Sequence, residues 1–179
     1  CCLTASEWRE RFAHWIEHGA PEDLLNASIY FDLRPVAGRQ ALAAPLREML
    51  VREAGQVPRF IKQMADNALR NRVPLSWRGS VETQSIGGRE MFDLKMNGTA
   101  IFVDVARLYA LAHGVDELGT RARLGAVAAA LKAGPAESES WISAFEFLQM
   151  LRLQVQIGRG EGAATPDNPN LIDVGTLND

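Results

Sequence analysis

The sequence has no long hydrophobic run and almost no cysteine. No stretch approaches the roughly 18 to 20 apolar residues that a membrane-spanning helix requires, and no basic start followed by an apolar signal core opens the chain. The two cysteines, Cys1 and Cys2, are adjacent, so they cannot join distant parts of the fold by disulfides. We therefore expect a soluble, cytoplasmic protein without membrane contact, whose core is held by packing alone.

The chain also lacks an excess of charge of either sign. Its formal net charge is -3 and its pI is near 5.7, which gives no general attraction to polyanions. Residues 59–78 are a local exception, with five basic residues and one acidic residue. This segment has no interleaved aromatic stacking platform apart from Trp77, so we interpret it as a solvated helix face. Nucleic-acid binding, with an affinity that falls steeply with salt, is the disfavoured alternative.

The composition is otherwise that of an ordinary globular chain. Of 179 residues, 47% are hydrophobic and 23% are charged, which is enough for one sizeable core. From Gly158 onward, Gly, Pro, Asn and Asp predominate. We therefore predict one helical domain over residues 1–157 and an irregular acidic tail over residues 158–179. The chain does not start with Met, so we expect it to be a piece of a longer protein.

Helical patterns fill most of the chain. Thr4 to Glu7 is typical of a capping box at the start of a helix, and Pro21 suits the first turn of a second helix. Pro45 indicates either a kink in a third helix or a late start of that helix. Apolar repeats at helical spacing predict further helices over residues 57–69, 101–112, 117–133 and 138–157. The last of these is apolar on two faces, which predicts a place near the centre of a bundle.

The period of the pattern changes between residues 80 and 95. Two short segments, residues 80–86 and 89–95, are joined by Gly87 and Gly88, the strongest hairpin signal in the chain. The predicted fold is therefore mostly α. We expect a helical bundle of about six or seven helices with one small β-hairpin at about residues 80–95.

Several motifs, in a fixed order, resemble one family of bacterial proteins. The first is residues 26–36, where Asp32 and Arg34 interrupt an apolar run. The others are Arg-Val-Pro-Leu at 72–75, Phe-Asp-Leu-Lys at 92–95, Ile-Phe-Val-Asp-Val-Ala-Arg at 101–107 and Ala-Phe-Glu-Phe-Leu at 144–148. Over about residues 4 to 156, the chain resembles the "putative nucleotidyltransferase substrate-binding domain" family. That family is the C-terminal helical half of nucleotidyltransferases similar to the PII uridylyltransferase, often regulated by CBS or cyclic-nucleotide modules.

The resemblance implies a division of labour within a longer polypeptide. In family members the catalytic nucleotidyltransferase domain lies upstream, and that domain, with its Mg²⁺ ions, is absent from this chain. The chain itself would then bind and position a nucleotide and an acceptor of unknown identity, with a protein among the candidates. By this resemblance it is not catalytic alone, has no cofactor of its own and shares its polypeptide with regulatory domains.

One segment comes close to a catalytic motif. A nucleotidyltransferase of this superfamily needs a Gly-Ser turn and, about ten residues later, two carboxylates one residue apart that hold metal ions. Gly79 and Ser80 precede Asp93 at a suitable distance, but Lys95 stands in place of the second carboxylate. A protonated lysine cannot bind a divalent metal. We therefore predict no catalytic residue and no metal site, and interpret the Gly-Ser pair as a loop entering the hairpin.

Five charged residues form the candidate substrate-binding set: Asp32, Arg34, Lys95, Asp104 and Arg107. In one interpretation, Arg34, Lys95 and Arg107 converge on a phosphate or an acidic acceptor. A guanidinium contacts phosphate at two points and a lysine adds a point charge, which suits this role. In the other interpretation, the acids and bases pair with one another and fix the register of the helices. Both interpretations stand at the level of the sequence.

The alternative function is a non-catalytic helical interaction or dimerisation module in a multidomain signalling protein. The Ala-rich run at residues 126–131 suits a helix-to-helix contact in a homodimer as well as close packing within the domain. Trp77 lies outside any helical stripe, so its exposure would make it an interface candidate. Trp8, Trp15 and Trp141 sit at core spacings and are predicted to pack inside.

Overall fold

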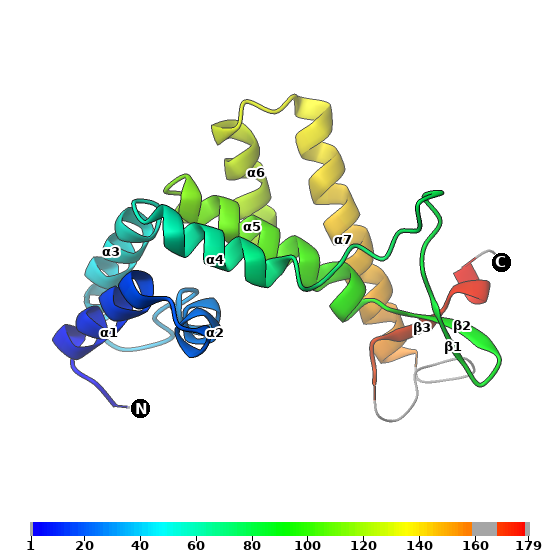
Figure 1. Ribbon diagram of the computed structural model, residues 1–179, viewed down its shortest axis with the longest axis horizontal. Coiled ribbons are helices and arrows are strands. Elements are labelled where there is room, and N and C mark those ends of the chain that lie inside the picture. The colour runs from blue at the N-terminus through cyan, green and yellow to red at the C-terminus, as the bar shows by residue number, and fades with distance from the viewer. Residues whose placement is uncertain (1, 159–167, 178–179) are drawn as a thin grey trace. The chain divides into compact units, whose positions relative to one another are not determined.

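A computed structural model of the chain describes residues 2–158 and 168–177 (Figure 1). These residues form two compact units, and neither unit is continuous in sequence. Unit 1 comprises Cys1–Leu69 and Val105–Ala133, and unit 2 comprises Arg70–Asp104 and Gly134–Asp179. The chain therefore enters each unit twice.

The helices of unit 1 begin where the sequence signals place them. α1 (Ala5–His18) opens with the predicted capping box, in which the N–H of Thr4 donates to the Glu7 carboxylate at 2.7 Å and the N–H of Glu7 donates to the Thr4 hydroxyl. α2 (Pro21–Tyr30) starts at its proline. Pro45 lies in the first turn of α3, so it marks a late start rather than a kink. The other helical segments of this unit are a 3₁₀ helix (Gln40–Leu42), α3 (Ala44–Ala54), α4 (Pro58–Ala68), the C-terminal part of α5 (Ala100–Ala112) and α6 (Thr120–Ala130).

Aromatic packing forms the core of unit 1. Phe31, directly after α2, is 2% exposed, and its ring centroid lies 5.6 Å from that of Phe12 and 5.8 Å from that of Phe60. Trp15 is buried in the same cluster, as predicted, and Trp8 packs against it. Because residues from α1, α2, α3, α4 and α5 all contribute, this cluster fixes the positions of α3 and α5, which carry Arg47 and Arg107.

Unit 2 contains a three-stranded antiparallel sheet. β1 (Gln84–Ile86) and β2 (Arg89–Asp93) form the predicted hairpin, with Gly87 and Gly88 in its turn at positive φ. β3 (Leu171–Asp173) pairs with the other edge of β2. The hairpin is confirmed, although its strands are shorter than the predicted 80–95 and Lys95 belongs to a following π-helical turn (Lys95–Thr99).

The prediction of an irregular tail over residues 158–179 was wrong for the part that the structure describes. β3 and a 3₁₀ helix (Val174–Leu177) are regular elements, and Leu171 and Ile172 are buried. A strand of three residues is too short to show alternation, so the surrounding Asn, Asp and Gly dominated the sequence pattern. Residues 159–167 and 178–179 of this tail lie outside the described residues.

β3 is tied to α7 (Pro135–Ile157) by an amide network within unit 2. The side-chain oxygen of Asn170, which is 8% exposed, accepts hydrogen bonds from Nε of Arg152 at 2.8 Å and from Nε2 of Gln156 at 3.1 Å. An amide oxygen buried at this level needs such donors. The network therefore holds β3 against α7.

The prediction that α7 lies at the centre of a bundle was wrong. Phe145 is its buried residue, with a ring centroid 6.0 Å from that of Phe102. A second apolar stripe on the same helix is exposed: Phe147, Met150, Leu153 and Ile157. Two apolar faces indicate two contact surfaces, and here the described residues bury only one of them.

The fold class itself is confirmed. The described residues form seven α-helices and one small antiparallel sheet, which is a mostly α architecture. No described helix combines the length and the apolar character that crossing a membrane would require.

Candidate functional site

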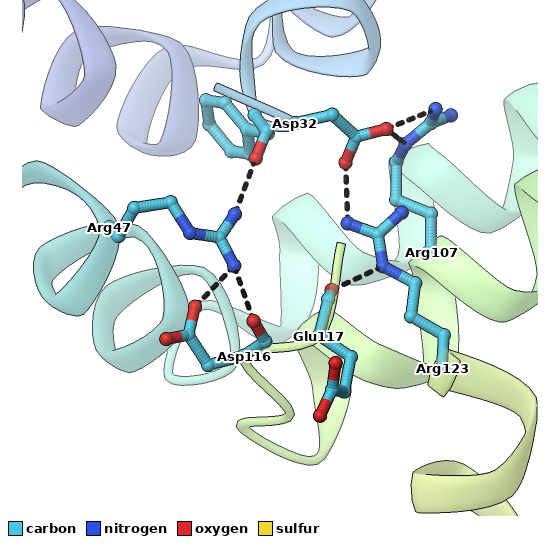
Figure 2. A network of polar contacts seen from close by, with 7 residues as sticks. Asp32, Arg47, Arg107, Asp116, Glu117 and Arg123 are labelled. Atoms are coloured by element: carbon cyan, nitrogen blue, oxygen red, sulfur yellow. Dashed lines mark hydrogen bonds and ion pairs between the residues drawn. The ribbon is translucent and has the colours of Figure 1, made fainter. Parts of the chain in front are cut away.

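Asp32 lies just after α2, and its carboxylate contacts two arginines from later helices (Figure 2). Arg107 of α5 donates to Oδ2 of Asp32 through Nη2 at 2.8 Å and through Nε at 3.3 Å. Arg123 of α6 donates to Oδ1 through Nη2 at 2.5 Å. We call these three residues the Asp32 cluster. It joins segments of unit 1 that lie 75 and 91 residues from Asp32 in the sequence.

Burial and charge act on Asp32 in opposite directions. The side chains of Arg123, Arg107 and Asp32 are 5%, 11% and 29% exposed. Burial alone would raise the pKa of the Asp32 carboxyl, because the charged form loses hydration. The hydrogen bonds from Arg123 and Arg107, with their positive charges, outweigh this effect and lower the pKa below its ordinary value. The carboxylate is therefore ionised at neutral pH and neutralises one of the two guanidinium charges.

Two of the arginines in Figure 2 also bind backbone carbonyls. Arg47 of α3 donates to the carbonyl of Phe31 at 3.0 Å and to that of Asp116 at 2.8 Å, and it forms an ion pair with the Asp116 carboxylate. Arg123 donates through Nε to the carbonyl of Glu117 at 2.8 Å. Carbonyls at helix ends and in loops lack partners within a helix. These contacts therefore hold the end of α2 and the α5–α6 connection in place.

The structure brings only part of the predicted site together. Asp32 and Arg107 are in direct contact, as the structural interpretation requires. Arg34 is exposed and makes no hydrogen bond or ion pair with any described residue. Lys95, also exposed, and Asp104 belong to unit 2. Within unit 1, the charged centre is thus an Asp-Arg-Arg cluster that includes Asp32 and Arg107 of the predicted set.

Arg123 is the residue of this cluster that sequence reasoning missed. It lies in the Ala-rich segment beside a second arginine, Arg121, and a base among alanines is typical of a solvated helix face. The structure buries it beside Leu124 and Val127 on the same side of α6. The signal that could have identified it is its spacing, because Arg123 lies four positions before the core residue Val127 and therefore on the same face of the helix. An arginine on a buried face needs a partner, since an unpaired arginine is almost never buried. Its partner, Asp32, cannot be named from such a local pattern.

Asp93, the acid of the incomplete catalytic motif, caps backbone in unit 2. Its Oδ1 accepts hydrogen bonds from the N–H groups of Lys95 at 2.9 Å and Met96 at 2.8 Å, and its Oδ2 accepts one from Asn168 at 2.8 Å. Both carboxylate oxygens are therefore engaged in holding the turn after β2. Among the residues that the structure describes, no group of three or more potential ligands is placed to hold a metal ion.

Two surface depressions of unit 1 lie apart from the Asp32 cluster. One, of about 650 Å³, includes Arg52 and Asp116. The other, of about 350 Å³, lies between the start of α1 and the start of α3 and includes Arg9 and Leu42. None of the three residues of the Asp32 cluster lines either depression.

Comparison with family models assigns the chain. A model described as "Putative nucleotidyltransferase substrate binding domain" matches residues 58–179, more than half of the sequence. The chain belongs to this family. No curated protein and no solved structure gives a significant match to it. The matched region of this substrate-binding domain starts at α4, so the resemblance at residues 4–57, including residues 26–36, lies outside it.

Acidification should destabilise unit 1 of this substrate-binding domain through Asp32. The pKa of Asp32 is lower in the folded chain than in the unfolded chain, where an aspartate titrates near 3.9. The cluster therefore adds stability above that pH, and this contribution is lost as the pH falls through the folded pKa. Urea unfolding followed by circular dichroism should show that the stability difference between wild type and Asp32→Asn shrinks as the pH falls below about 5. A difference independent of pH would contradict this account.

Proposed function

We propose that this chain is the substrate-binding and positioning domain of a bacterial, cytoplasmic nucleotidyltransferase and that it does not catalyse transfer alone. The observation that carries the proposal is the family match over residues 58–179. The hydrogen bonds of Asp93 support the proposal. Asp93 is the acid of the incomplete catalytic motif, and its carboxylate accepts hydrogen bonds from backbone N–H groups. The domain therefore contributes binding and orientation rather than a reacting group.

The catalytic domain upstream would supply the Mg²⁺ ions, which align and polarise the phosphoryl group. This domain would hold the nucleotide or the acceptor against that centre, with CBS or cyclic-nucleotide modules of the same polypeptide regulating the reaction. Fixing two reactants in a productive geometry lowers the barrier even when the holding group takes no part in bond making. Such a role needs charged side chains that are free to contact a ligand.

Arg34 and Lys95 are the predicted site residues that suit ligand contact. Each is exposed, and neither side chain forms an ion pair with a described residue. The Arg107 side chain, by contrast, is only 11% exposed and is bound to Asp32. We assign ligand binding to Arg34 and Lys95, each within its own unit, and a structural role to Asp32 and Arg107.

Loss of either exposed charge should weaken substrate use without harming the fold. In a polypeptide that carries the catalytic domain upstream, Arg34→Ala and Lys95→Ala should each lower kcat/KM about tenfold. A charge-assisted contact is worth about 1.5 to 3 kcal/mol, and 1.4 kcal/mol corresponds to a factor of ten. The urea unfolding midpoints should match that of wild type. The isolated chain, with Mg²⁺ and each of the four nucleoside triphosphates, should show no turnover above a blank.

Arg39→Ala is the matched control for Arg34→Ala, because Arg39 is also exposed in unit 1. It should leave kcat/KM unchanged. Robust turnover by the isolated chain would contradict the division of labour. If Arg34→Ala and Lys95→Ala both unfold their units, these two side chains are structural and the ligand assignment is wrong.

An interaction or dimerisation module is the second candidate function, and the exposed apolar stripe of α7 favours it. Four large apolar side chains on one helix are exposed in the described structure: Phe147, Met150, Leu153 and Ile157. Such a patch is typical of a protein contact. Analytical ultracentrifugation over a range of concentrations distinguishes a homodimer from a monomer that keeps this stripe for another domain.

A further inference from the structure

The segment between α4 and β1 forms a second, smaller hairpin in unit 2 (Figure 1). Leu75 and Val81 pair as an isolated antiparallel bridge, and the N–H of Glu82 donates to the carbonyl of Pro74 at 2.7 Å. We call residues 74–82 the tip loop. These two contacts close its base, so the residues between them form a defined loop.

The apex of the tip loop is fixed by its two serines. The N–H of Ser76 donates to the carbonyl of Ser80 at 2.9 Å, and their hydroxyl oxygens lie 2.6 Å apart. The N–H of Gly79 donates to the carbonyl of Ser76 at 2.9 Å, and Gly79 has a φ of 80°, a conformation that glycine adopts without strain. The Gly-Ser pair therefore closes a turn, as the loop interpretation predicted. The turn presents the two residues that it encloses, Trp77 and Arg78.

Trp77 is held at this apex with its ring in solvent. Its side chain is 88% exposed, whereas Trp15 in the core of unit 1 is 5% exposed. The guanidinium carbon of Arg78 lies 4.6 Å from the centroid of the Trp77 ring, which is a cation–π contact. An indole gains free energy from burial. The packing of unit 2 therefore does not account for a tryptophan in this position.

The pair of side chains matches the two parts of a nucleotide. A flat aromatic face stacks on any nucleobase, and a guanidinium binds phosphate through two parallel hydrogen bonds. At 88% exposure the indole keeps open ring surface besides the part near Arg78. Arg78 donates no hydrogen bond and forms no ion pair within the described residues. Stacking surface and N–H donors are thus both available at one point.

One nucleotide suits the tip loop better than a nucleic-acid strand. Proteins that bind single strands use successive aromatic platforms along a basic groove. The tip loop has one such platform, Trp77, and the chain has a formal net charge of -3. Stacking on one ring does not read the edges of a base, so the four nucleotides should bind with similar affinity.

We propose that Trp77 and Arg78 form a nucleoside triphosphate-binding site on the tip loop, in which the base stacks on the indole and the guanidinium binds the phosphates. The proposal rests on the proposed function, which requires a nucleotide or an acceptor to be held. It assigns the nucleotide to the tip loop and leaves Arg34 and Lys95 for the remaining contacts with substrate.

Isothermal titration calorimetry of the 179-residue chain with ATP, GTP, CTP and UTP tests the site. Trp77→Ala should raise Kd about tenfold or more, because base stacking is lost, and Trp77→Phe should retain most of the affinity. Arg78→Ala should also raise Kd about tenfold, through the lost phosphate contact. Arg89→Ala is the matched control, an exposed arginine of the same unit, and should bind as wild type does. All variants should keep the wild-type circular dichroism spectrum.

Equal affinity of wild type and Trp77→Ala, or no nucleotide binding by the wild-type chain, would overturn the tip-loop site. Neither result removes the proposed function, since the domain then holds the nucleotide elsewhere or holds the acceptor, and the kcat/KM values of the Arg34 and Lys95 variants test that separately. Affinity for oligonucleotides that grows with their length and falls steeply with salt would also overturn the site, in favour of a strand-binding surface.

Discussion

Replacing Asp32 by Asn should lower the free energy of unfolding of unit 1 by about 3 kcal/mol. The change removes the negative charge between Arg107 and Arg123, whose side chains are 11% and 5% exposed. The two guanidiniums then lose the carboxylate that bridges them in a poorly solvated place. An asparagine amide also brings two N–H donors toward groups that only donate. Urea unfolding followed by far-UV circular dichroism at pH 7 measures the loss.

Asp66→Asn is the control for this charge removal within unit 1. Asp66 pairs with Lys62 at 2.7 Å on α4, and their side chains are 58% and 75% exposed. A pair so exposed contributes about 0.5 kcal/mol or less. If Asp32→Asn costs no more than Asp66→Asn, burial of the Asp32 cluster does not contribute to stability in the way proposed.

Replacing Phe31 by Ala should destabilise unit 1 even more, by about 4 kcal/mol. The Phe31 ring is 2% exposed and lies among the rings of Phe12, Trp15 and Phe60. Rigid aromatic neighbours cannot close the cavity that the missing ring leaves, so the loss of burial and the cavity both contribute. The same urea experiment measures this change.

Val36→Ala is the matched control for Phe31→Ala, because Val36 is close in sequence but 89% exposed. It should change stability by no more than about 0.5 kcal/mol. The two core variants also separate packing from charge: the cost of Phe31→Ala should stay the same as the pH falls, whereas that of Asp32→Asn should shrink. A Phe31→Ala loss with the same pH dependence would mean that it acts by disturbing the Asp32 cluster.

Signals that act over a few residues predicted much of the local structure. The capping box at Thr4, the first-turn Pro21 and the paired glycines of the hairpin each need only their own neighbours, and all three are confirmed. The mostly α fold follows from such signals and from helical spacing. The motifs that carry the resemblance are short and ordered as well, and the family match over residues 58–179 confirms the family they indicated.

Features that depend on distant partners were either missed or predicted wrongly. Arg123 meets Asp32 across 91 residues, and no pattern within α6 names that partner. β3 is a strand because β2 offers it an edge, not because its own three residues alternate. The two-faced pattern of α7 indicated two contacts, but a sequence cannot state whether a contact surface is met within the same domain. Charge and apolar pattern thus predicted the residue types of the site and not their assembly.

The division of the chain into two discontinuous units gives the order in which its parts become complete during synthesis. Residues 105–133 of unit 1 lie between the two halves of unit 2, so every residue of unit 1 has been made once Ala133 has left the ribosome. The sheet of unit 2 is completed later, because its third strand, β3 (Leu171–Asp173), lies beyond Ala133 in the sequence. The nascent chain therefore holds its charged cluster before it holds its finished sheet, and β2 keeps an unpaired edge throughout that interval.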